Sequence, residues 1–168
     1  MTDEQHILKL IQSHKELENF NYFKAVDWAI DLIRQGIEIE NVLMLASFSE
    51  PINRFEIKPY VTNVLNDFGL KELDYQRAVI AITHYHLTEI QNDRQIRRNL
   101  QSLYQLYADN DHQADLLNFY LIYHGWNELE EIGETDYLEG TDLNNINEVL
   151  RREARKWIDK YVREKDGE

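Results

Sequence analysis

The histidines at positions 84 and 86 are the first side chains to consider for metal chemistry. They are two residues apart, roughly 200° around a helix, so they face opposite sides and cannot share one ion. His86 and Glu89 can face one ion together, but a zinc site needs about three or four ligands. The spacing favours a hydrogen-bonded structural role for His86. A metal-dependent enzyme that uses His84 or His86 is kept as an alternative.

Other common catalytic motifs do not occur in the sequence. It has no cysteine, no glycine-rich phosphate loop and no Gly-x-Ser-x-Gly turn. Carboxylates are numerous, but Glu128, Glu130 and Glu131 resemble a solvated helix end rather than a catalytic pair. The acidic segment 133–139 lacks the Asp-x-Asp-x-Asp-Gly order of a calcium loop. The sequence therefore predicts a protein that is not an enzyme and binds no cofactor.

The segment from Asn99 to Leu150 contains no lysine and no arginine. It holds eleven acids, whereas the whole chain has a net charge of −13. These acids are Asp109, Asp111, Asp115, Glu128, Glu130, Glu131, Glu134, Asp136, Glu139, Asp142 and Glu148. Seven aromatic residues share the segment: Tyr104, Tyr107, Phe119, Tyr120, Tyr123, Trp126 and Tyr137. Concentrated negative charge with tyrosine and tryptophan is typical of a surface that meets a basic partner.

We expect Tyr123, Trp126 and Tyr137 to be exposed beside these acids, as aromatic anchors ringed by charge. The predicted partner-binding residues are Asp111, Asp115, Tyr123, Trp126, Glu128, Glu130, Glu131, Glu134, Asp136, Tyr137, Glu139 and Asp142. Ten flanking cations offer an alternative, because they could pair with the acids inside the fold and leave a plain surface. They are Arg94, Arg97, Arg98, Arg151, Arg152, Arg155, Lys156, Lys160, Arg163 and Lys165.

Composition narrows the class of protein. A chain of 168 residues with 43% hydrophobic residues is long enough to bury a core as a single domain. The absence of cysteine fits a reducing compartment. No apolar run has the length of a signal sequence core or a membrane span, so we expect a cytoplasmic protein without membrane contact. A pI of about 4.8 argues against nucleic acid as a partner.

Apolar residues recur at helical spacing along the chain, and no segment alternates as a strand would. We therefore predict an all-α fold of seven to eight helices, as a compact multi-helix bundle or a stack of antiparallel helical hairpins. A single helical domain of residues 1–168 would comprise N-terminal helices in 1–70, central helices in 74–132, a C-terminal helix in 141–163 and a frayed tail, 164–168.

Several local expectations follow from the same patterns. The first helix begins near Thr2, and Asp74 and Thr141 or Asp142 cap later ones. Pro59 lies in the first turn of a helix over 56–68. The run 116–123 is apolar almost all round, which predicts the most buried helix. Gly125 allows a neighbouring backbone to approach closely, and Leu143 faces inward with the apolar residues of the last helix.

A further pattern lies in the segments 45–57 and 65–70, which read Leu-Ala-Ser-Phe-Ser-Glu-Pro-Ile-Asn-Arg-Phe-Glu-Ile and Leu-Asn-Asp-Phe-Gly-Leu. It resembles small acidic, all-helical bacterial proteins of the immunity type, which are encoded beside contact-dependent or polymorphic toxins. The resemblance covers roughly two thirds of the chain and includes no catalytic motif. It implies a helical cytoplasmic protein that binds a cognate toxin domain.

Three hypotheses result. The first is a non-enzymatic immunity or inhibitor protein that binds a basic toxin domain, such as a nuclease, through an acidic aromatic surface. The second is a helical scaffold or regulatory adaptor that acts through homo-oligomerisation. The third is the metal-dependent enzyme using His84 or His86.

Overall fold

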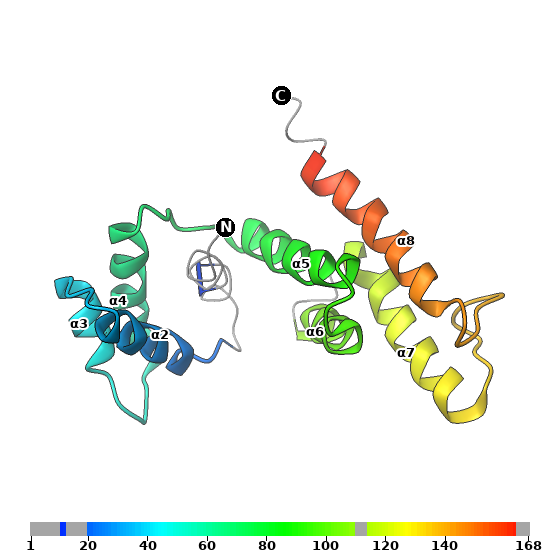
Figure 1. Cartoon of the computed structure of the whole chain (residues 1–168), viewed down its shortest axis with the longest axis horizontal. Coiled ribbons are helices and arrows are strands. Elements are labelled where there is room, and N and C mark those ends of the chain that lie inside the picture. Colours follow the sequence, from blue (N-terminus) through cyan, green and yellow to red (C-terminus); the bar gives the residue numbers. More distant parts are fainter. Residues whose placement is uncertain (1–10, 13–19, 110–113, 164–168) are drawn as a thin grey trace. The chain divides into compact units, whose positions relative to one another are not determined.

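The chain forms seven α-helices and no strand over the residues that the computed structural model describes, which are 11–12, 20–109 and 114–163 (Figure 1). The predicted all-α class is thus confirmed. The chain divides into two compact units, unit 1 (Met1–Val79) and unit 2 (Ile80–Glu168). The expected helix near Thr2, Asp111 and the predicted tail over 164–168 fall outside the described residues.

Unit 1 is built on three helices: α2 (Phe23–Arg34), α3 (Glu40–Ala46) and α4 (Arg54–Asp67). Helix α3 contacts both α2 and α4. The buried side chains of the three helices form one hydrophobic cluster, because each helix repeats its apolar residues every three or four positions. This cluster includes Val26, Trp28, Leu32, Val42, Leu45, Ile57, Val61 and Leu65.

Helix α4 begins earlier than the sequence pattern predicts. The Asn53 side chain accepts a hydrogen bond from the Phe55 N–H at 3.0 Å and so caps the helix at that point. Pro59 therefore lies in the second turn, not the first. The ring removes one backbone donor there, at a position where an intrahelical bond would otherwise form.

Helix α5 (Tyr75–Gln91) runs across the boundary between the two units. Asp74 caps it as predicted, since its carboxylate accepts the Arg77 N–H at 2.8 Å. In unit 2, α5 is followed by α6 (Ile96–Asp109), a short 3₁₀ turn (Ala114–Leu116), α7 (Leu117–Ile132) and α8 (Ile146–Ile158). A π-helical turn (Asp159–Arg163) continues α8.

Helix α7 contacts both α6 and α8 and supplies much of the core of unit 2. In Figure 1, α7 and α8 run in opposite directions on either side of one loop, as in the predicted helical hairpins. Phe119, Ile122, Trp126 and Leu129 form its buried stripe. Leu117 is 40% exposed, and α7 has five buried residues of sixteen against five of twelve in α2, so the prediction that the run 116–123 forms the most buried helix is wrong. Its two neighbours cover one side, and the other side meets water.

The start of the last helix differs from the prediction. The Asp142 carboxylate accepts the N–H groups of Asn144 and Asn145 at 2.8 and 3.0 Å, so it caps a turn at the expected place. That turn is not yet α8, which begins at Ile146. Leu143 lies in this turn, off the buried stripe, and is exposed rather than inward-facing.

No helix within the described ranges is both long and apolar enough to cross a bilayer.

We predict that Phe119→Ala lowers the free energy of unfolding by about 3–5 kcal/mol, because the ring is 1% exposed and a cavity would remain. Leu117→Ala, two residues away on the outer face of α7, should cost less than about 1 kcal/mol. Urea unfolding of both variants measures the difference. Equal losses would show that α7 is buried on both faces.

Candidate protein-interaction surface

The loop after α7, residues 133–145, is folded back against the helix it leaves. Gly133 ends α7 with φ 80°, a left-handed conformation that favours glycine, and its N–H bonds to the Leu129 carbonyl at 3.2 Å. Thr135 Oγ1 then donates a hydrogen bond to Glu128 Oε2 at 2.8 Å. The Tyr137 ring stacks on the His124 ring with centroids 5.8 Å apart.

Gly125 permits this close approach. A Cβ atom at that position would lie 2.8 Å from Leu138 Cδ1 and 3.2 Å from Thr135 Oγ1. The expectation of a close neighbour at Gly125 is confirmed, with the difference that loop side chains, rather than a backbone, make the approach. The absence of a side chain at this helix position therefore leaves room for the loop.

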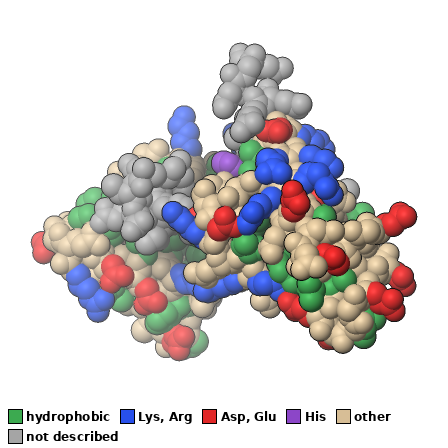
Figure 2. Space-filling view, turned by 45° about the vertical axis from the view of Figure 1, so that its right-hand side comes forward, with side chains coloured by type: hydrophobic (Ala, Val, Ile, Leu, Met, Phe, Trp, Pro, Cys, Tyr) green, Lys and Arg blue, Asp and Glu red, His purple; other side chains and the backbone are tan. Residues whose placement is uncertain are grey.

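Four acids on or beside this loop are exposed. They are Glu131, Glu134, Asp136 and Glu139, which we call the loop acids. Within the described part of the chain, none of their carboxylates makes an ion pair or a hydrogen bond. Figure 2 shows acidic side chains (red) along the right-hand edge of unit 2, with basic side chains (blue) gathered higher up. Because the loop is held against α7, these charges occupy defined positions.

Apolar side chains are exposed among the loop acids. Ile132 is 69% exposed and Tyr137 is 44% exposed, and Leu143 is also exposed. Isolated apolar residues are common on protein surfaces. Here three of them occur in one short segment with four carboxylates, which is the composition of a binding surface with a polar rim.

Six aromatic rings from α6, α7 and the loop contact one another, some of them stacked and others edge-to-face or tilted. They are Tyr104, Tyr107, Tyr120, Tyr123, His124 and Tyr137, which we call the ring cluster. Tyr104 stacks on Tyr123 with centroids 4.3 Å apart, and the edge of His124 meets Tyr120 at 4.5 Å. All six rings are at least partly exposed. Only Tyr123 and Tyr137 of this cluster were expected at the site from the sequence.

Arg97 of α6 lies against the same side of α7. Its guanidinium carbon is 4.7 Å from the Trp126 ring centroid and 5.7 Å from that of Tyr123. Its Nη2 donates hydrogen bonds to Asn127 Oδ1 at 2.6 Å and Glu130 Oε2 at 3.0 Å. Trp126 is only 8% exposed, which overturns its prediction as an exposed anchor. Trp126 is part of the core stripe of α7, with Arg97 against its ring.

Internal cations neutralise part of the acidic segment, as the alternative interpretation of the sequence predicted. Lys160 pairs with Asp115 at 2.9 Å and Arg97 pairs with Glu130 at 3.0 Å, so these two predicted site residues have internal partners. Other cations in the described ranges pair with acids outside the Asn99–Leu150 segment: Arg94 with Glu89, Arg151 with Asp93, and Lys156 with Glu153. The loop acids keep their charge unpaired.

Hydrogen bonds lower the pKa of two carboxyl groups among the predicted site residues. The pKa of Asp115 lies below its usual value, first because Lys160 donates a hydrogen bond to it and then because Tyr161 does. The same contact raises the pKa of Lys160 above its usual value. The pKa of Asp142 is lowered by the backbone N–H groups of Asn144 and Asn145. Asp142 therefore stabilises the turn at 142–145. Glu128, another predicted site residue, accepts the hydrogen bond of Thr135.

His86 has the structural contacts expected of it. Its Nδ1 is 2.8 Å from Asn99 Oδ1, and the Asn99 amide donates to the Arg94 carbonyl at 2.8 Å. The bond ties α5 to α6 across the turn between them. Over the residues that the structure describes, no group of three or more histidines and carboxylates is close enough to hold a metal ion.

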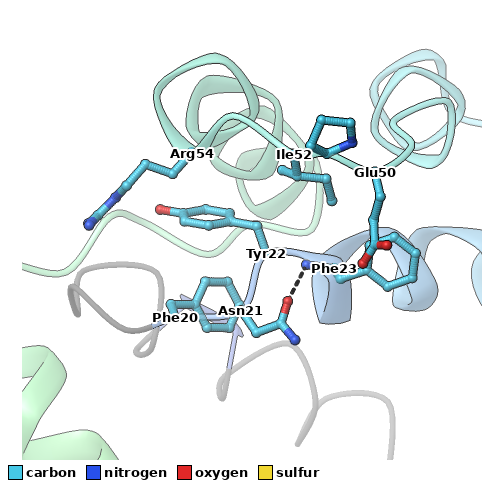
Figure 3. Close-up of a pocket in the computed structure, with 8 residues that line it drawn as sticks. Phe20, Asn21, Tyr22, Phe23, Glu50, Ile52 and Arg54 are labelled. Atoms are coloured by element: carbon cyan, nitrogen blue, oxygen red, sulfur yellow. Dashed lines mark hydrogen bonds between the residues drawn. The ribbon is translucent and has the colours of Figure 1, made fainter.

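Unit 1 contains an open cavity of about 610 Å³, lined by aromatic and apolar side chains together with Asn21, Glu50 and Arg54. Figure 3 shows Tyr22 between Arg54 and Phe20, with the Glu50 carboxylate beside Phe23. The Asn21 side chain accepts the Phe23 N–H at 3.0 Å and so orders the start of α2. Arg54 and Glu50 lie on opposite sides of the cavity and do not form an acid–base pair (Figure 3).

No family model, no curated protein and no solved structure matches the chain. The resemblance to immunity proteins therefore stays a prediction. The candidate surface is defined by the loop acids, the exposed apolar residues among them and the ring cluster.

We predict that Lys160→Gln raises the pKa of Asp115 toward its ordinary value of 3.8, because the main hydrogen bond that lowers it is lost. In the native protein, the pair of Lys160 and Asp115 stabilises the fold at any pH above the ordinary pKa of Asp115. This stabilisation is lost as the pH falls through the lowered pKa of Asp115 in the folded protein. Carboxyl NMR titration measures the shift. Lys156→Gln, whose lysine pairs with Glu153, is the control and should leave Asp115 unchanged.

We also predict that Thr135→Val loosens the loop while nearly conserving the side-chain volume. The substitution removes the bond to Glu128 and the acceptor of the Tyr137 N–H, which is 3.1 Å from Thr135 Oγ1. Hydrogen exchange of the Tyr137 amide should become at least about fivefold faster, because the loss of each of these two hydrogen bonds is worth about that factor. Thr141→Val is the control, since the Thr141 hydroxyl makes no hydrogen bond among the described residues. Equal exchange in both variants would contradict the proposed anchoring.

Proposed function

We propose that the protein is a non-enzymatic binding module whose partner is a basic protein. This proposal rests on one observation: four unpaired carboxylates and three exposed apolar side chains lie together in the segment 131–143, at the end of α7 and on the loop held against it. Apolar contacts with such a surface would supply affinity, and the charges would speed association and select partners of opposite sign. Because the loop is already ordered by its contacts with α7, little conformational entropy would be lost on binding.

The position of the acids argues against a role in stability. The last turn of α7 contains no basic residue, and of its two glutamates Glu130 binds Arg97 whereas Glu131 is unpaired. Carboxylates at the C-terminal end of a helix oppose its dipole and cost about 0.3–1 kcal/mol each. Contact with a basic partner would explain why acidic residues occur at this end of the helix.

The concrete form of the proposal rests on the resemblance to immunity proteins. An immunity or inhibitor protein would use this surface to occlude the basic cleft of a cognate toxin domain, such as a nuclease whose site binds phosphate. Steering by the loop acids would give fast association that salt weakens.

Self-association is the second candidate, and exposed apolar residues of unit 1 favour it. Ile39, Leu43 and Met44 on or next to α3 are exposed, as is Phe55 at the start of α4. Exposed apolar side chains of this kind can mark a protein–protein contact, including one between two copies of the chain.

A charge-neutralised variant tests the first candidate. Converting Glu131, Glu134, Asp136 and Glu139 to Gln or Asn changes the net charge from −13 to −9 (four negative charges removed). We expect at least about tenfold weaker binding of a basic partner recovered at low salt, measured by calorimetry, and no loss of free energy of unfolding.

The matched control removes four exposed acids of unit 1, Asp27, Glu38, Glu40 and Glu56, and so has the same net charge. It should bind the partner almost as well as the native protein. Equal weakening of both variants would mean that only the overall field matters and that the loop is no binding site. Recovery of the protein itself as the sole partner would favour self-association instead.

A further inference from the structure

The ring of Tyr137 is the exposed end of the ring cluster. One of its sides stacks on His124 at 5.8 Å and an interplanar angle of 30°, and the residue is 44% exposed. Its N–H is bonded to Thr135, so the backbone that carries the ring is held in place. Asp136 precedes it in the chain, and Glu134 and Glu139 lie within three residues. An aromatic face among carboxylates is a favourable place for a cation.

Arg97 already demonstrates this chemistry against the same helix. Its guanidinium stacks on Trp126 and Tyr123, while Asn127 and Glu130 accept its hydrogen bonds. Its Nη1 is buried and has no hydrogen-bond acceptor among the described residues, so ring contact takes the place of a bond there. Arg97 thus combines two parts, an aromatic face and a carboxylate. Lys160 repeats it in part, over the Tyr161 ring at 4.7 Å with Asp115 at 2.9 Å.

Tyr137 and the loop acids supply the ring and the carboxylates, and the chain places no internal cation over that ring within the described residues. We propose that Tyr137, backed by His124 and flanked by the loop acids, is the docking point for an arginine side chain of the basic partner. This inference rests on the proposed function and adds which side chain of the partner is recognised. Arginine suits the place better than lysine, because its planar guanidinium stacks on a ring while its edge binds carboxylates.

Defined peptides test the inference even while the partner is unidentified. One peptide alternates arginine with glycine, a second alternates lysine with glycine, and a third carries neutral citrulline in place of arginine. Calorimetry at one low salt concentration measures their dissociation constants with the full-length protein. We expect the arginine peptide to bind about two- to fivefold more tightly than the lysine peptide, and the citrulline peptide to bind much more weakly than both.

Three variants locate the preference. Tyr137→Leu should reduce the arginine-to-lysine ratio to about one, and Tyr137→Phe should retain it, because the ring face is kept. Tyr75→Leu is the matched control, since that tyrosine of unit 1 is 40% exposed, and it should leave the ratio unchanged.

The outcomes separate this inference from the function on which it rests. Equal binding of the arginine and lysine peptides by the native protein, lost when the loop acids are neutralised, would overturn the arginine site and support the acidic surface. An arginine preference that survives Tyr137→Leu would also overturn it. Failure of both basic peptides to bind would count against the inference and the proposed function together.

Discussion

The surface of unit 2 depends on the contact between Gly125 and the loop that follows α7. Leu138 and Thr135 occupy the space that a side chain at position 125 would fill. That contact brings Tyr137 onto His124 and Thr135 onto Glu128. A loop of this composition without such contacts would be mobile and solvated, and its charges would have no fixed arrangement. The absence of a side chain at position 125 thus leaves room for the contacts that order the acidic segment.

Charge is distributed so that it cannot be fully neutralised within unit 2. Lys160 and Arg97 each pair with one acid of the cation-free segment, and the lowered pKa of Asp115 records one of these contacts. The loop acids are exposed to solvent. Exposed ion pairs contribute about 1 kcal/mol or less, so pairing every acid would have stabilised the fold little. Unpaired acids therefore cost the fold little while keeping a strong field at one end of the α7–α8 hairpin.

The aromatic residues of unit 2 divide between core and surface according to the periodicity of α7. Phe119, Ile122 and Trp126 follow the buried stripe at spacings of three and four, whereas Tyr120 and Tyr123 fall beside it. Trp126 was predicted to be exposed because it lies beside acids in the sequence. Its helical register with Phe119 and Ile122 was the stronger signal, since it places the indole on the buried face.

The sequence by itself determined the helical class, the positions of most helices and the concentration of acids, because periodicity, caps and charge are local properties. Asp74 caps α5 as its side chain predicted, whereas Asp142 caps a turn that precedes α8. Only the tertiary structure decided which acids remain unpaired, that six rings from three segments meet, and that Arg97 covers Trp126. These outcomes depend on contacts between residues distant in the chain, whose partners are set by how helices pack rather than by any single segment.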